Sequence, residues 1–158
     1  MISPEQTSKE ISGNSTDIIV QPYADRILIL VTQLGKVGNL LQASLPQTTP
    51  LQPAPDPDAT NPNAVLLPPP PPGIQLTSLL GSAPSDHQRT LHHLYASQIA
   101  TIVWVAESGG ALAGPRRDVV IGLALRKAAV AEEDNTLSAT ERETYNAVML
   151  SLQAMLKG

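Results

Sequence analysis

The chain has 158 residues, 42% of them hydrophobic and 15% charged, a balance that suits one domain with a single core over residues 1–158. Its formal net charge of -4 makes the long-range field mildly repulsive to phosphate, so we expect no nucleic-acid partner. The absence of cysteine excludes disulfides, cysteine–zinc sites and thiol nucleophiles. The polar N-terminal segment lacks the pattern of a secretory signal, and no apolar run approaches the roughly 20 residues that span a bilayer. We therefore expect a cytoplasmic or nuclear protein with no membrane partner.

The chain begins with polar residues and then shows a hairpin pattern. Residues 1–9 are expected to be disordered. Two β-branched or leucine-rich runs follow at 16–23 and 26–33. They are separated by Ala24 and Asp25, which suit a two-residue turn. The pattern predicts two paired antiparallel strands.

The second of these runs is apolar from Ile27 to Val31 without alternation. Such a run predicts a central strand that protein covers on both faces. A third strand is expected over 39–45, and it ends at Pro46.

The middle of the chain is rich in proline. Of the 15 prolines, 11 lie between Pro46 and Pro72. Proline fixes φ and removes the amide donor, so we interpret 46–73 as a long mobile insertion. Asp56 and Asp58 are its only charges, which makes them candidates for contacting a basic patch on a partner. An equal alternative is that they keep a spacer soluble.

A strand over 74–81 and then a long helix are expected after the insertion. The helix begins at a capping box formed by Ser85 and Gln88. The stretch 98–106 could alternatively be a buried strand, because periodicity does not decide β-branched runs. As a helix, the segment has an apolar face made by Leu91, Leu94, Tyr95, Ile99, Ile102, Val103 and Ala106, with Arg89, His92, His93 and Gln98 outside it.

Another apolar strand is expected over 118–125, followed by a C-terminal amphipathic helix. A second capping box, Ser138 with Glu141, marks the start of that helix. The order of elements predicts an α+β fold: a mainly antiparallel β-sheet of about five to six strands, a long central helix and the C-terminal helix. The apolar face of the last helix is expected to contain Tyr145, Val148, Met149, Leu152 and Leu156.

None of the familiar catalytic or ligand-binding patterns is intact. Lys36 lies in LGKVG, but Leu30 and Val37 occupy the positions where a phosphate-binding loop needs glycine and serine or threonine. Ser108 lacks the glycines of a nucleophile elbow. The three histidines, His87, His92 and His93, are not at the spacing of a zinc pair and are interpreted as exposed. We expect no enzyme, no cofactor and no metal.

The segment RILILVTQLGKVGNLL resembles the family of the third proteasome assembly chaperone, which has a strand of this type running into a VTQ-x-GK-x-G turn. Thr32, Gln33, Gly35, Lys36 and Gly38 carry the turn. The resemblance covers about 10–45 and 76–157 and suggests a fungal-type member with an unusually long proline-rich insertion.

This resemblance implies a non-catalytic chaperone for assembly of the 20S proteasome α-ring, without a cofactor. It also implies a heterodimer with a homologous chaperone of the fourth type and contacts with α-subunits, an α5-type subunit first. The candidate protein-binding residues are Gln33, Lys36, Asp56, Asp58, Arg116 and Arg117. The adjacent pair Arg116 and Arg117 could instead be a solvated turn.

Pairing is expected from the sequence pattern as well. A small sheet with continuous apolar strands needs cover on both faces, and two helices protect only one, so a homodimer in isolation is also open. The competing hypothesis is a proline-rich adaptor or scaffold, whose run from Pro68 to Pro72 docks in an SH3 or WW domain.

Overall fold

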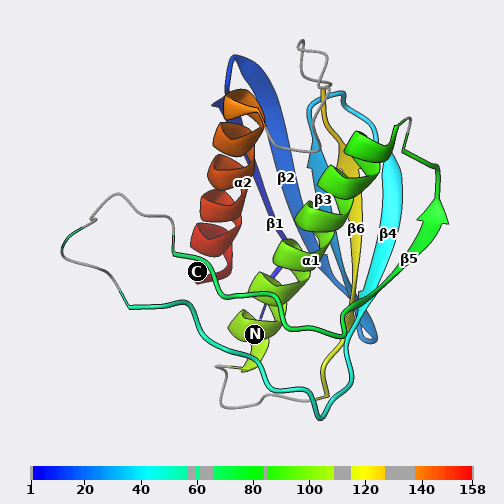
Figure 1. The fold of residues 1–158 in the computed structure, drawn as a ribbon, viewed down its shortest axis with the longest axis vertical. Helices are drawn as coiled ribbons and strands as arrows, with labels where there is room; N and C mark the ends of the chain where they lie inside the picture. The colour runs from blue at the N-terminus through cyan, green and yellow to red at the C-terminus, as the bar shows by residue number, and fades with distance from the viewer. Residues whose placement is uncertain are drawn as a thin grey trace.

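In the computed structural model, residues 2–56, 60, 66–83, 85–108, 115–126 and 138–157 are described. Figure 1 shows two layers: a six-stranded sheet and two helices that lie on one of its faces. This arrangement confirms the predicted α+β fold. In chain order the elements are β1 (Glu5–Ile11), β2 (Asn14–Pro22), β3 (Arg26–Thr32), β4 (Asn39–Ser44), β5 (Gln75–Leu80), α1 (Asp86–Ser108), β6 (Asp118–Ala124) and α2 (Ala139–Lys157).

The sheet has the order β1-β2-β3-β6-β4-β5. All neighbouring strands are antiparallel except β3 and β6, which are parallel. The β2–β3 hairpin turns where it was predicted, and the Tyr23 amide donates to the Arg26 carbonyl over 2.8 Å. β3 lies between β2 and β6, so its predicted central position is confirmed, but the described helices cover only one of its faces.

The expectation that residues 1–9 are disordered is wrong for residues 5–9, which belong to β1 and pair with β2. The turn between these strands is formed by Ser12 and Gly13, both at positive φ (51° and 80°), as a tight two-residue hairpin requires. β1 is an edge strand and most of its side chains are exposed, so its composition is polar. Polarity alone therefore suggested disorder.

Both predicted capping residues lie at the helix starts, and at α2 both hydrogen bonds of the capping box are formed. The Ser85 hydroxyl accepts the Gln88 amide over 3.2 Å at the start of α1. At α2, the Ser138 hydroxyl accepts the Glu141 amide over 3.1 Å, and the Ser138 amide donates to Glu141 Oε1 over 3.0 Å. These contacts satisfy amides that a helix start leaves without an internal partner. The stretch 98–106 is helical, not a strand.

The core lies between the sheet and the two helices. Alternate residues of β2, β3 and β6 face it, and α1 and α2 close it from the other side. Tyr95 of α1 and Tyr145 of α2 meet edge to face with ring centroids 5.2 Å apart. Burial raises the pKa of Tyr145 to about 12. The largest fully buried side chains are Trp104, Tyr95, Ile18, Ile27, Ile29, Ile99, Ile121, Leu123, Met149, Leu152, Val20 and Val31.

The long helix α1 is buried on more sides than its apolar stripe indicated. Leu94, assigned to the packed face, is 43% exposed, whereas Gln98, assigned outside it, is buried. Gln98 Nε2 donates to the Pro68 carbonyl over 2.8 Å, so the insertion covers this side of the helix. A one-stripe prediction fails here because the sheet, α2 and the insertion each contact a different side of α1.

The prediction of exposed histidines is wrong for two of the three. His87 Nε2 lies 2.9 and 3.0 Å from the two carboxylate oxygens of Glu141, which joins the starts of α1 and α2. His92 is buried, and its Nδ1 lies 3.3 Å from Asn39 Nδ2. Only His93 is exposed. Both His87 and His92 have partners on other elements, which spacing within one helix cannot reveal.

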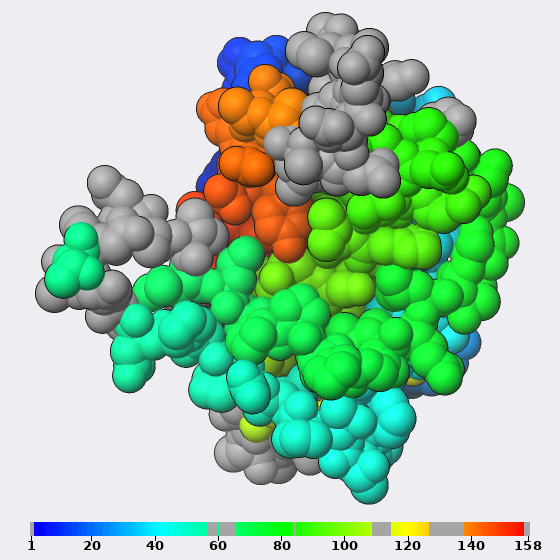
Figure 2. Space-filling view, in the orientation of Figure 1, coloured from blue at the N-terminus to red at the C-terminus, as the bar shows by residue number. Residues whose placement is uncertain are grey.

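The described ends of the insertion pack against the domain, so the interpretation of 46–73 as a mobile arm is wrong at both ends. Leu51 and Leu67 lie against the core. Pro68 is buried, and Gln153 of α2 donates to the Leu66 carbonyl over 3.2 Å. Figure 2 shows this segment lying across α1 on the helix side of the molecule. None of the helices in the described part of the chain is long and apolar enough to cross a membrane.

Candidate protein-binding surface

The face of the sheet opposite the helices carries rows of aligned residues from successive strands. Side chains that alternate with the core positions point to this face. The strand register places one row at Gln6, Ile19, Leu30, Gly122, Leu40 and Leu80, and a second at Gln21, Leu28, Val120, Gln42 and Thr77. We call this surface the open face.

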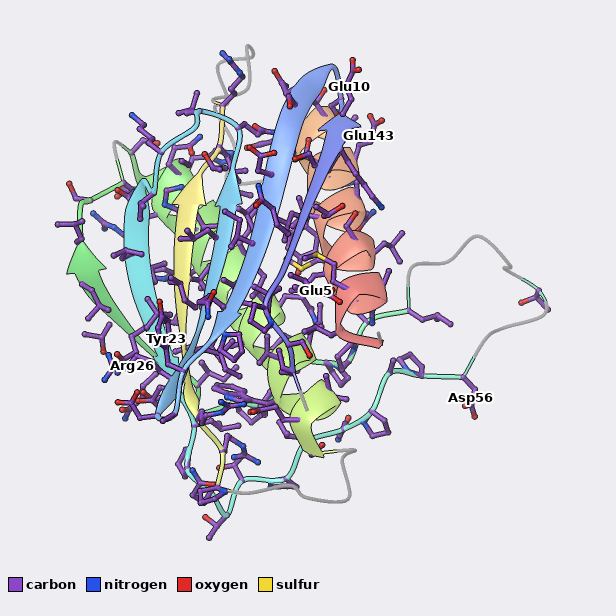
Figure 3. All side chains as sticks on the ribbon, turned by 180° about the vertical axis from the view of Figure 1, so that it is seen from behind. Glu5, Glu10, Tyr23, Arg26, Asp56 and Glu143 are labelled. Atoms are coloured by element: carbon purple, nitrogen blue, oxygen red, sulfur yellow. The ribbon has the colours of Figure 1, made fainter. Side chains whose placement is uncertain are left out.

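The centre of the open face is apolar. Ile19, Leu28, Leu30 and Leu40 are partly exposed, and Leu80 is 59% exposed. Figure 3 looks onto the sheet from this side, with α1 and α2 behind it. Among the described elements, helix packing is confined to the other face. A continuous apolar surface of this kind is typical of a protein contact site.

Gly122 lets two of the leucines approach each other across β6. A Cβ atom built at this position would lie 2.4 Å from Leu30 Cδ2 and 3.2 Å from Leu40 Cδ2. The leucine side chains therefore extend over the glycine from the strands on either side. The result is a closed apolar strip across the middle of the sheet.

Polar groups border this strip. Gln42 Nε2 donates to Asp118 Oδ2 over 3.1 Å, and the Ser8 hydroxyl donates to Asp17 near the β1 edge. Tyr23, 52% exposed, and Arg26 lie at the β2–β3 turn (Figure 3). An apolar centre with a polar border is the usual anatomy of a protein interface.

Contacts within the chain explain the residues found in the turn after β3. The Thr32 hydroxyl accepts the amides of Leu34 and Lys36, each over 3.2 Å. Gly38 has φ of 71°, and a Cβ there would lie 2.1 Å from the Leu123 carbonyl oxygen, so only glycine fits. The Lys36 side chain is exposed and free to contact a partner.

Gln33, the other candidate from this turn, is 8% exposed and makes three contacts within the chain. Its amide donates to the Ala124 carbonyl, its Nε2 donates to the Thr16 hydroxyl over 3.1 Å, and its Oε1 accepts the Arg126 amide over 2.8 Å. Gln33 therefore connects β2, β3 and β6. It is a structural residue and does not lie on a docking surface.

Arg116 and Arg117 are not a solvated turn. Arg117 Nε donates to Glu107 over 2.9 Å and its carbonyl accepts the indole of Trp104 over 2.7 Å. Arg116 donates to the Thr49 carbonyl over 3.0 Å and lies 5.9 Å from the centre of the Trp104 ring. The pair fastens the start of β6 to the end of α1 and to the insertion.

The acidic candidates lie in the insertion. Asp56 is exposed and stands away from the rest of the molecule (Figure 3). Asp58 lies outside the described residues. Within the described part of the chain, no three histidine or carboxylate side chains are grouped as metal ligands would be.

The open face itself was not among the residues singled out from the sequence. The unbroken apolar run from Ile27 to Val31 was the available signal, because alternate members of such a run must lie on opposite faces. No known protein-family model matches the sequence, and no curated protein matches it either.

Proposed function

We propose that this chain is a non-catalytic assembly chaperone that pairs with a homologous chaperone through the open face of its sheet. The observation that carries the pairing is the apolar strip over β2, β3, β6 and β4, on the side of the sheet without described helices. The sequence resemblance to the third proteasome assembly chaperone supports the process in which the chain would act. That process is assembly of the 20S proteasome α-ring in the cytoplasm, with α-subunits as clients and no cofactor.

Burial of the strip supplies a driving force for pairing. Full burial of a leucine or isoleucine side chain is worth about 1.5–3 kcal/mol. The side chains of the strip are only partly buried, so part of this free energy would be gained when a partner covers them. Leu80, at the β5 end of the first row, is the most exposed of them. A second sheet is a suitable cover, because two apolar sheet faces pack at a spacing of about 10 Å with interdigitating side chains.

Among the described candidates, Lys36 and Asp56 are left for contacting an α-subunit, since the side chains of both are exposed. Lys36 is at the β3–β4 turn and Asp56 is in the insertion, so neither lies in the centre of the open face. A pair joined through its sheets would keep both of them accessible.

The adaptor hypothesis for the proline run gains less support. Pro68 is buried, and its carbonyl is held by Gln98. An SH3 or WW groove would have to compete with these contacts. Pull-down from cells separates the two functions: capture of α-subunits and a small partner chaperone supports the proposal, whereas capture of SH3 or WW proteins alone supports the adaptor.

Pairing is tested with two leucines of similar exposure. Leu80→Asp, 59% exposed on the open face, is expected to convert a pair into a monomer on sizing with light scattering. Leu150→Asp, 47% exposed on α2, is the matched control and should leave the pair intact. Circular dichroism melting checks that both variants fold. A wild-type monomer that also fails to bind a homologous chaperone would contradict the proposal.

A further inference from the structure

The two edge strands of the sheet are protected very differently. β1 carries Glu5, Lys9 and Glu10. β5 has the sequence QLTSLL, with no charge and no proline, and Leu79 and Leu80 are 47% and 59% exposed. Natural edge strands usually carry charges or proline to prevent pairing with other chains. β5 lacks both devices, so its edge is available for a further strand.

A depression of about 290 Å³ lies beside β5, between the sheet and the start of α1. Figure 1 shows β5 at the margin of the sheet with the first turns of α1 next to it. The side chains around the depression are neutral or cationic, and no carboxylate is among them. Its lining is Asn39, Leu41, Leu76, Ser78, Gly81, Ser82, Ala83, Arg89, His92 and His93.

Arg89 supplies the positive charge at the depression. The Arg89 side chain is 61% exposed, and its contact with Asp86 is long at 3.5 Å, with Asp86 itself 92% exposed on the solvent side. Burial, with the nearby His93, lowers the pKa of His92. His92 Nδ1 lies 3.3 Å from Asn39 Nδ2, so His92 is already engaged within the chain. Arg89 remains able to bind an incoming anion.

A strand added to the edge of β5 would lie about 4.8 Å from it, with alternate side chains pointing to the α1 side of the sheet. On that side, Leu76 and Ser78 of β5 already border the depression. A side chain of the added strand at the same level would therefore meet Arg89 and His93. A carboxylate is the group that the Arg89 guanidinium selects.

We propose that β5 accepts an extended segment of another polypeptide as an additional strand, with an acidic side chain of that segment in the depression beside Arg89. Backbone hydrogen bonds to β5 would give affinity, and the carboxylate would fix the register and the choice of partner. This inference is independent of pairing through the open face, because it uses the edge of the sheet and its helix side. It holds even if the chain is a monomer.

The test uses three capped seven-residue peptides of alternating threonine and valine, with glutamate, glutamine or lysine at the centre. Each is titrated into the full chain, with binding followed by fluorescence anisotropy and the contact mapped by amide NMR. The glutamate peptide should bind about tenfold more tightly than the lysine peptide, with shifts at β5 and not at β1. Equal binding of the three, shifts at β1, or no binding at millimolar peptide would overturn the proposal.

Two variant pairs separate the backbone contribution from the charge. Leu79 has no Cα partner in β4 because the register shifts beside it, so proline is tolerated there. Leu79→Pro places in the edge strand a residue that disfavours pairing with a further strand and should abolish binding, whereas Leu79→Ala should keep it. Arg89→Ala should remove the preference for glutamate over glutamine, whereas Arg26→Ala, at the far turn, should retain it. If Arg89→Ala kept the preference for glutamate, the proposed site beside Arg89 would be wrong.

Self-association of the chain that Leu79→Pro abolishes, without any peptide binding, would mean that the β5 edge pairs with a second copy of the chain instead.

Discussion

The two faces of the sheet are built from alternate residues of the same strands, yet they differ in both shape and exposure. In β3, Ile27, Ile29 and Val31 are fully buried beneath the helices, whereas Leu28 and Leu30 on the open face are only partly buried. The covered face uses mainly β-branched side chains, which have few rotamers and pack tightly against a helix layer. The open face uses mainly leucine, which is not β-branched and has more rotamers. An unbroken apolar run therefore reports that both faces are apolar, but not that both are covered within one chain.

The contrast between the two faces is tested most sharply by introducing one charged side chain beneath the helices and another on the open face. Leu152 of α2 is fully buried, so Leu152→Asp is expected to lower the free energy of unfolding by several kcal/mol and to unfold much of the protein. Leu80→Asp on the open face should change melting little. Thermal melting by circular dichroism measures both. Loss of pairing by Leu152→Asp without loss of fold would instead place this stripe of α2 in the interface.

The insertion tests how much of the cover on the helix side comes from outside the helices. Deletion of 48–71 with a short linker removes the carbonyls of Pro68, Leu66 and Thr49, which accept hydrogen bonds from Gln98, Gln153 and Arg116. Each hydrogen bond contributes about 0.5–1.5 kcal/mol net, and shortening the loop recovers only about 0.6 kcal/mol per halving of its length. We expect the free energy of unfolding to fall by about 2–3 kcal/mol in urea titration.

That expectation differs from the one the sequence supports, which is a dispensable arm. Unchanged stability after the deletion would mean that the contacts of Pro68 and Leu67 with the domain contribute nothing measurable. Gln98→Ala, which keeps the insertion and removes one of its contacts, should give a smaller loss of about 1 kcal/mol. Capture of α-subunits by the deleted form then reports separately whether Asp56 and its neighbours take part in binding.

The next smaller effect concerns the junction of the two helices over the covered face. His87→Ala removes the hydrogen bonds to Glu141 at the starts of both helices and is expected to lower the free energy of unfolding by about 1–3 kcal/mol. His93→Ala on the exposed side of α1 is the matched control, and its effect should stay within about 0.5 kcal/mol. If the two substitutions lowered the free energy of unfolding equally, the contact between His87 and Glu141 would not contribute to stability.

The stability of the helix layer is also expected to depend on pH in the alkaline range, because Tyr145 of α2 is largely buried there. The pKa of Tyr145 is raised to about 12 by burial, so the folded state favours the neutral phenol. Its contribution to stability is complete below the unfolded pKa of about 10 and is lost as pH rises from there towards 12. Tyr145→Phe should therefore melt with less dependence on pH between about 10 and 12. A wild type and variant with parallel pH profiles would show that this phenol is not protected.

The sequence predicted the covered side well, because its signals are local. Ser138 and Glu141 lie three residues apart, and the capping box they form could be recognised directly. The pairing of His87 with Glu141 could not, since the partners are 54 positions apart and belong to different helices. Gln33 was misjudged for the same reason: it lies in a recognisable turn, but its contacts at Thr16 and Arg126 come from distant segments.

A small effect on stability is expected at Gly122, in the middle of the open face. The nearest obstacle to an alanine methyl is the mobile end of Leu30, and the Val37 carbonyl oxygen is tight at 3.1 Å, so Gly122→Ala should cost only about 1 kcal/mol. The displaced Leu30 side chain would nevertheless rise from the strip and weaken pairing, measured by the dimer dissociation constant.

Leu30→Ala supplies the second arm of a double-mutant cycle with Gly122→Ala. Truncating Leu30 removes the atom that the new methyl would meet, so the double variant should lose less pairing than the sum of the two single losses. Additive losses would mean that Gly122 does not act through Leu30. If neither substitution changed the dimer dissociation constant, the interface would lie elsewhere on the molecule. Pairing would then not explain why the open face is apolar.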